Sequence, residues 1–317
     1  MLTPSQVNLS GHNKAVVISE RDFAMLEFLW RHRAVTFLTL YEIFYNKIKM
    51  LTCYTRLDKL RRQGFITTRG EDGSTRRYWC LERRGMAYLA QNMETLKTLG
   101  FKPQSLYHDH LASSILLGDW YRELPAGVHV VTEQDLISRD LPKVAPGFQD
   151  GTERRPDGLW SFKVGPVMKF VALELELHAK PDQLYSEIVR YYDNNFGVEK
   201  VIWVVSGEKL MHRIHQISLA HATLKKSDHL FLSANDVKKS LWQAIFKNDS
   251  LKGVSLAEFL TSFLTNPGKP PTSTPKSTPT NTAQVAEKPL APSVLLNFDG
   301  CFVKSSPYSK SRRRKKT

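Results

Sequence analysis

The stretch from residue 19 to residue 82 most constrains what this chain can fold into, because helical spacing gives way there to the spacing of a hairpin. Ser19 and Asp22 are separated like a helix N-cap and its acidic partner, and apolar residues then recur at helical intervals. We expect further helices over 39–45 and 50–62, the last ended by Gly64 in a C-cap position.

A hairpin should follow these helices. The sequence FITTRGEDGSTRRYWCLE, residues 65–82, places two β-prone runs on either side of Asp72-Gly73, a strong turn signal. Three helices followed by a hairpin is the order of a winged helix-turn-helix, and a helix over 82–96 would close it. We therefore predict an N-terminal arm over 1–18 and a winged helix domain over 19–98.

Residues 105–264 are predicted to form an α/β (α+β) domain. Helical and β-prone segments alternate there: helices over 110–124 and 182–193, strands over 128–134 and 201–206, and a hairpin turning at 163–166. Residues 207–264 should add helices around a short strand, HLFLS.

The C-terminal segment, 265–317, has a different composition. Its first part is rich in Pro, Thr and Ser and cannot bury enough apolar surface to order, which predicts a disordered linker. The terminal run KSRRRKKT is either a phosphate-binding tail or a solubilising one.

The chain is strongly basic. Its 45 Lys and Arg against 31 Asp and Glu give a net charge of +14, which favours a polyanionic partner and, above all, nucleic acid. No apolar run approaches the roughly 20 residues of a spanning helix, so we expect no membrane insertion. Three cysteines without metal-site or disulfide spacing, and an N-terminus without a secretory core, indicate a reducing cytoplasm.

The third helix of such a domain enters the DNA major groove, and the wing contacts phosphates or a minor groove. Solvated charges on a protein-binding winged helix are the alternative. The candidate DNA-binding residues are Lys47, Lys49, Thr52, Thr55, Arg56 and Lys59 in and before the helix, with Arg69, Arg76 and Arg77 in the wing.

An acidic pattern lies in FVALELELHAK, residues 170–180. Glu174, Glu176 and His178 alternate with aliphatic residues, so they share one face of a strand. Asp157 would lie near the end of the neighbouring strand, and three carboxylates could converge on one divalent cation, Mg²⁺ or Mn²⁺. The same alternation is also what any sheet with one solvated face shows.

Asp157 in RPD and Glu174 in ELE, seventeen positions later, resemble the PD-(D/E)xK core of restriction endonucleases. The resemblance implies catalytic and metal-binding roles for Asp157, Glu174 and Glu176. Glu176 stands where lysine is usual, and Lys180 could substitute for it in space. Glu133, in VVTEQDL, occupies the region where this fold can supply a further acid to the metal.

The order of motifs from about residue 19 to 205 resembles the plasmid replication-relaxation family and the MobC-type mobilization relaxases. It includes YHDHLASSILLGDWYREL, TEQDL, RRPDGLW and ALELEL. The resemblance implies a bacterial cytoplasmic endonuclease that nicks double-stranded plasmid DNA at a transfer or replication origin, with coupling or accessory relaxosome proteins as partners. The alternative is a catalytically inactive DNA-binding regulator of plasmid replication or transcription.

Three further features of the sequence each allow two interpretations. His108 and His110 form either a paired-histidine metal site or, as we expect, the start of a helix. Tyrosines at 185, 191 and 192 offer a phenolic nucleophile, although packing is favoured by their helical spacing. His178 is either a base near the acids or a residue at the strand edge.

Overall fold

The computed structural model describes residues 16–70, 75–93, 105–117, 128–138, 155–194, 197–221 and 228–265. Most of the predicted arm, the turn at Asp72-Gly73, the boundary between residues 98 and 105, and the linker and basic tail lie outside these ranges. Within the described ranges, no helix has the length and apolarity needed to cross a membrane.

The N-terminal part begins with the predicted helix. In α1 (Glu20–His32), Ser19 and Asp22 form a reciprocal capping box, as their spacing predicts. The second helical region is a single α-turn, α2 (Phe37–Leu40), continued by a π-helical turn, η1 (Tyr41–Tyr45). The third helix, α3 (Met50–Arg62), has the predicted bounds, and Gly64 follows it with φ of 75°.

An antiparallel hairpin and a fourth helix complete this part, which we call the helix-and-hairpin module (residues 20–92). Strand β1 (Ile66–Gly70) pairs with β2 (Arg77–Leu81), and Val35 adds a bridge to Trp79. Helix α4 (Arg83–Asn92) packs against α1. One core joins α1, α3, the hairpin and α4, with Leu26, Leu57 and Leu89 fully buried in it.

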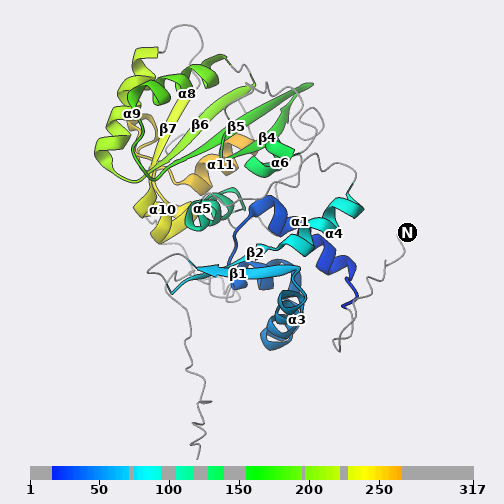
Figure 1. Ribbon diagram of the computed structural model, residues 1–317. Coiled ribbons are helices and arrows are strands. Elements are labelled where there is room, and N and C mark those ends of the chain that lie inside the picture. Colours follow the sequence, from blue (N-terminus) through cyan, green and yellow to red (C-terminus); the bar gives the residue numbers. More distant parts are fainter. Residues whose placement is uncertain are drawn as a thin grey trace, which may run out of the picture.

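The second part is built on a five-stranded mixed sheet of order β3-β4-β5-β6-β7 (Figure 1). The first three strands are antiparallel, whereas β5, β6 and β7 are parallel. Gly165, with φ of 61°, lies in the predicted turn between β4 and β5. The strands are β3 (His129–Thr132), β4 (Gly158–Val164), β5 (Val167–Glu176), β6 (Val198–Val205) and β7 (Asp228–Ser233).

Helices cover both faces of this sheet (Figure 1). On one face α8 (Asp182–Asn194) and α9 (Glu208–His221) pack on Phe170 and Ala172 of β5. On the other face α5 (Leu106–Leu117), α10 (Ala234–Ser240) and α11 (Leu256–Thr265) pack against Leu173 and Leu175. Alternate residues of β5 therefore serve two separate cores.

Several predicted boundaries are wrong. Helix α4 ends at Asn92, with Met93 in an extended conformation, rather than at residue 96. Helix α5 begins at Leu106 rather than at residue 110, and the Ser105 hydroxyl accepts a hydrogen bond from the N–H of His108. The strand predicted over 128–134 ends at Thr132, and α6 (Glu133–Ser138) starts directly after it. Thr132 and Asp135 make reciprocal backbone-to-side-chain hydrogen bonds, which start this helix.

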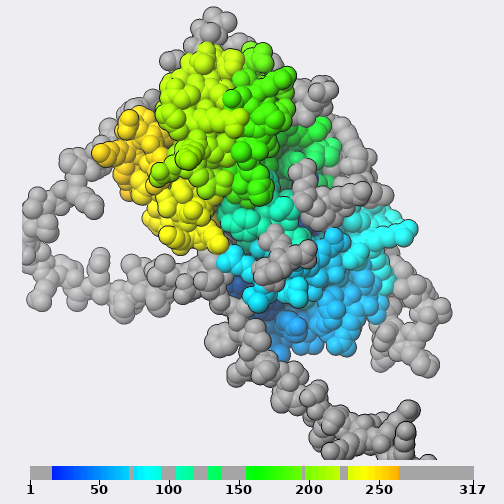
Figure 2. Space-filling view, turned by 60° about the vertical axis from the view of Figure 1, so that its left-hand side comes forward, coloured from blue at the N-terminus to red at the C-terminus, as the bar shows by residue number. Residues whose placement is uncertain are grey.

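The two parts touch along the end of α1, which contacts α5 and α6. Figure 2 shows them as two lobes in contact, with α5 at the boundary. The Arg31 guanidinium binds the Asp135 carboxylate at 2.9 Å and donates to the Val130 carbonyl oxygen at 2.7 Å. The Ser113 hydroxyl donates to the His32 carbonyl oxygen. Side chains at the end of α1 thus fix the module on the sheet-bearing part.

Candidate functional site

Helix α3 has an inner face in the module core and an outer face that is exposed. Cys53, Leu57 and Leu60 fill the core from the inner face. The predicted DNA-binding residues before and on this helix, apart from Arg56, are exposed; they are Lys47, Lys49, Thr52, Thr55 and Lys59. Thr52, Thr55 and Lys59 follow one another at helical spacing on the exposed side of α3, and Lys47 and Lys49 are exposed just before it; we call these five residues the α3 face.

The hairpin that follows α3 carries further cations. Arg69 and Arg77 are exposed, and Arg76 is half-buried. The guanidinium of Arg77 occupies the space above Gly70, where a Cβ would lie 2.0 Å from its Nη1 atom.

Arg56 does not join the α3 face. Its guanidinium forms an ion pair with Asp22 of α1, whose side chain is buried, and it also donates to the Val17 carbonyl oxygen. Burial favours the neutral form of Asp22, but hydrogen bonds from Arg56 and Ser19 outweigh it and hold the pKa of the carboxyl below its usual value. The contacts of Arg56 are those of a residue that anchors α3 on α1.

Glu174 and Glu176 are buried, with 4% and 1% of their surface exposed, on the sheet face that α8 covers. The Tyr192 hydroxyl donates to Glu174, and the Tyr185 hydroxyl donates to Glu176 at 3.4 Å. The Lys180 ammonium lies 2.6 Å from Glu176 Oε1. Lys180 thus lies beside Glu176, the residue at the motif position where lysine is usual.

Asp157 lies just before β4 and is tied to β5. Its N–H donates to the Leu173 carbonyl oxygen at 3.0 Å, and its Oδ2 accepts from the Leu175 N–H at 2.6 Å. Its other oxygen, Oδ1, lies 3.5 Å from Nε2 of His108 on α5. The Asp157 carboxylate is therefore held by α5 and the β5 backbone, whereas the two glutamates are held by residues of α8 and Lys180.

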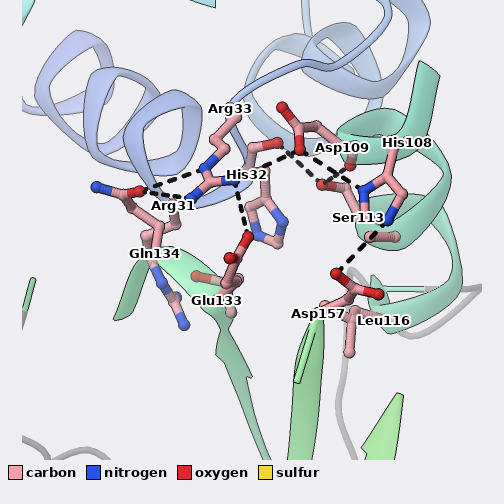
Figure 3. A pocket seen from close by; sticks show the side chains of 12 residues that line it. Arg31, His32, Arg33, His108, Asp109, Ser113, Leu116, Glu133, Gln134 and Asp157 are labelled. Atoms are coloured by element: carbon pink, nitrogen blue, oxygen red, sulfur yellow. Dashed lines mark hydrogen bonds and ion pairs between the residues drawn. The ribbon is translucent and has the colours of Figure 1, made fainter. Parts of the chain in front are cut away.

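A charged cluster surrounds a cavity of about 20 Å³ at the junction of the two parts, room for roughly one water molecule (Figure 3). Arg33, at the end of α1, lies 2.8 Å from Glu133 Oε2 and 3.5 Å from Asp109 Oδ1. His108 lies between Asp109 and Asp157. Arg33 and His108 are thus the cations among three carboxylates of the sheet-bearing part.

Burial and charge in this cluster shift the pKa values of His108 and Glu133. Burial lowers the pKa of His108, but its contacts with Asp109 and Asp157 outweigh this and raise it to about 10. Burial raises the pKa of Glu133, which the Arg33 charge opposes and the Asp157 and Asp109 charges reinforce. The contacts with Asp109 and Asp157 therefore favour the imidazolium form of His108.

Two further histidines near the junction are neutral. Burial, assisted by the Arg31 charge, lowers the pKa of His32 to about 3. Burial, assisted by Arg76, lowers that of His110 to about 4. His108 and His110 lie within the first turns of α5, as the helix-start interpretation predicts.

The acids do not assemble into a metal site. Among the described residues, no three His, Cys, Asp or Glu side chains are grouped so that they could hold a metal ion. Glu174 and Glu176 are bound by tyrosines and Lys180, and Glu133 pairs with Arg33. The residues present therefore do not fit Mg²⁺ or Mn²⁺ in this arrangement.

Sequence reasoning missed Arg33, Asp109 and Asp135, which join the two parts. The TEQD sequence, with the spacing of a capping box, was an available signal for Asp135 and for the start of α6. Arg33 has φ of 59° and ψ of −54°, a conformation rare for a side-chain-bearing residue that no local sequence pattern indicates.

No family model matches this chain, and no curated protein matches it. Among solved structures, the restriction endonuclease FokI is similar at 12% sequence identity, with TM-scores of 0.23 bound to DNA and 0.24 without. The alignment covers 68% of this chain but 43% and 42% of FokI, so this chain spans less than half the length of that enzyme. A likeness of this size carries no argument about the function of the chain.

Proposed function

We propose that this chain binds double-stranded DNA through a winged helix-turn-helix formed by residues 20–92. In this assignment α3 is the recognition helix and the β1–β2 hairpin is the wing. The supporting observation is that one side of α3 fills the core while the other is exposed, with exposed cations before the helix, on it and in the hairpin that follows. A helix that enters the major groove needs one free face with base-reading side chains near its start.

Charge supports a polyanionic partner for this surface. Lys47 and Lys49 lie directly before α3, Lys59 lies on it, and Arg69 and Arg77 lie in the hairpin. Cations in such positions contact phosphates and fix the orientation of a protein on the duplex. The net charge of +14 has the same sign, so the whole chain is attracted to DNA.

The sheet-bearing part is then a body to which the DNA-binding module is fixed. Ion pairs of the half-buried Arg31 and the buried Arg33 connect the two parts. Binding of an origin on plasmid DNA, as a regulator of replication or transcription, is the form of this function that we favour. Coupling or accessory proteins would dock on the sheet-bearing part.

Nicking of a plasmid transfer origin is the second candidate. The observation that favours it is the Lys180 ammonium beside Glu176, because PD-(D/E)xK nucleases place a lysine at that motif position. Against it, Asp157 contacts His108 whereas Glu174 contacts Tyr192, and the described residues hold no group fit for a metal. A nickase would need these side chains to rearrange.

Selection from a random duplex library with the full chain tests the DNA-binding proposal. We expect an enriched sequence whose affinity falls about tenfold or more in Lys59→Glu, because a charge reversal on α3 repels the duplex. Lys238→Glu is the matched control, since Lys238 is exposed on α10 and carries the same change. Failure to enrich any sequence, or equal losses in both variants, would contradict the proposal.

The same protein tests the second candidate. Supercoiled plasmid carrying the selected sequence is incubated with Mg²⁺ or Mn²⁺ and resolved on a gel. A nickase produces open circles with wild type and none with Asp157→Asn, which should still bind DNA. Tight binding without open circles under both metals supports a regulator.

A further inference from the structure

The start of α3 exposes an apolar strip. Leu51 is 75% exposed, Tyr54 is 53% exposed and Met50 is 48% exposed. Single exposed apolar side chains are common on soluble proteins. Here, however, three occur within five residues of one helix, and Met50 and Tyr54, four positions apart, are neighbours on its surface.

The Tyr54 end of this strip lies against the edge of the module core, whereas Leu51 faces solvent. The Tyr54 ring makes edge contacts with Phe37 and Trp79, at centroid distances of 5.9 and 6.5 Å. The Thr55 hydroxyl donates to the Leu51 carbonyl oxygen at 2.9 Å, which turns its polar group back onto the helix. The start of α3 therefore presents apolar and methyl groups in fixed positions.

The positive charges around this apolar strip favour a nucleic acid as the partner that binds it. Exposed Lys47, Lys49 and Lys59 flank it along the chain, and Arg69 and Arg77 lie in the adjacent hairpin. An apolar protein partner would have to bury these cations without a counter-charge, whereas phosphates supply one on both sides of a groove.

Within the major groove, each base offers different chemistry. Adenine is read by Asn or Gln, and guanine by Arg or Lys, whereas thymine presents a 5-methyl group to apolar side chains. The sequence of α3, MLTCYTRLDKLRR, contains no Asn or Gln. Its arginines are occupied, because Arg56 pairs with Asp22 and both Arg61 and Arg62 pair with Asp58.

Resting on the DNA-binding function proposed above, we propose that Met50, Leu51 and Tyr54 recognise the 5-methyl groups of pyrimidines in the major groove. Thymine and 5-methylcytosine share this chemistry. Leu51 is the most exposed of the three and makes the main contact. Lys59, two turns further on, remains available for a guanine or a phosphate.

The test uses the full chain and the duplex selected from a random library. Synthetic duplexes in which deoxyuridine replaces thymidine lose only the methyl group and keep their base pairing. We expect substitution at one or two positions to weaken wild-type binding about three- to tenfold. A second set with 5-methylcytosine in place of cytosine tests the other source of the methyl group, and stronger binding there assigns the strip to methylated cytosine.

A substitution at Leu51 tests the contribution of this side chain alone. Leu51→Ala should bind the thymine duplex more weakly by a similar factor and should no longer distinguish thymine from uracil. Leu219→Ala, at a leucine of α9 that is 54% exposed, is the matched control and should retain the discrimination. Circular dichroism checks that both variants are folded.

Two results overturn the inference in distinguishable ways. Tight binding of the selected duplex by wild type with equal affinity for the thymine, uracil and 5-methylcytosine forms refutes methyl recognition and leaves DNA binding intact. Binding of no duplex at all refutes the DNA-binding function and the inference together.

Discussion

The guanidinium of Arg33 lies 2.8 Å from the carboxylate of Glu133, across the junction between the helix-and-hairpin module and the sheet-bearing part. Gln134 accepts two further hydrogen bonds from the same guanidinium, and Asp109 lies 3.5 Å from it. Because Arg33 is buried, its charge is compensated by these groups rather than by water. This contact is the main electrostatic link between the two parts.

Arg33→Ala should lower the free energy of unfolding by about 3–5 kcal/mol, because it leaves the buried Asp109 and the half-buried Glu133 without this cation. Arg33→Gly should cost about 1 kcal/mol less in unfolding free energy, because glycine adopts the backbone conformation of this position with less strain than alanine. Urea denaturation measures both values.

The control for this pair is Arg213, which lies in the regular helix α9. At this position the glycine variant should lose about 1 kcal/mol more unfolding free energy than the alanine variant, since glycine disfavours a helix. A larger loss for Gly than for Ala at position 33 as well would contradict the assigned backbone strain.

His108 should make stability depend on alkaline pH. Its folded pKa of about 10 lies above the ordinary value of 6.5, so the folded state holds the proton more tightly than the unfolded chain. The stabilisation is complete below pH 6.5 and is lost as pH rises towards 10. At pH 6 the unfolding free energy of wild type should exceed that of His108→Gln by about 2–4 kcal/mol. This difference should become smaller as pH rises above 6.

Chemical denaturation at several pH values between 6 and 10 measures this gap. His212→Gln, at an exposed histidine of α9, should show no such trend. A gap that widens with rising pH would mean that His108 is neutral in the folded protein.

Tyr192→Phe removes the hydroxyl that donates to the buried Glu174 carboxylate. We expect a loss of about 1–3 kcal/mol in unfolding free energy, because a buried acceptor loses a donor. DNA affinity should not change, since Tyr192 lies on α8, far along the chain from the module. Tyr88→Phe is the control within α4, where the ring packs against Phe23 and Phe65. Equal losses in both variants would contradict a special role for the Tyr192 hydroxyl.

Strong local signals allowed much of the fold to be predicted. The capping box at Ser19, the periodicity of 50–62 and the alternation around Glu174 each depend on residues a few positions apart. Helix α8 and the β4–β5 hairpin follow for the same reason. The hydrophobic pattern and the turn residues of these elements lie close together in the sequence and are sufficient to predict them.

The contacts of the candidate sites could not be predicted in this way. Arg56 was expected on the α3 face, but its partner Asp22 lies 34 positions away. Arg33 and Glu133 are 100 positions apart, and Asp157 meets His108 only after α5 packs on the sheet. Such pairs depend on tertiary packing, and the helical or strand spacing of nearby residues cannot predict them.

Salt dependence of DNA binding tests the central claim most directly. The observed affinity of wild type for its selected duplex should fall linearly with salt on logarithmic axes, and the slope should decrease by about 1–2 in Arg76→Ala/Arg77→Ala, because each phosphate contact releases counterions. The double variant Lys238→Ala/Lys239→Ala removes two exposed cations from α10 and should keep the wild-type slope. A slope that is unchanged when both wing arginines are removed would contradict the assignment of this hairpin and of α3 to DNA.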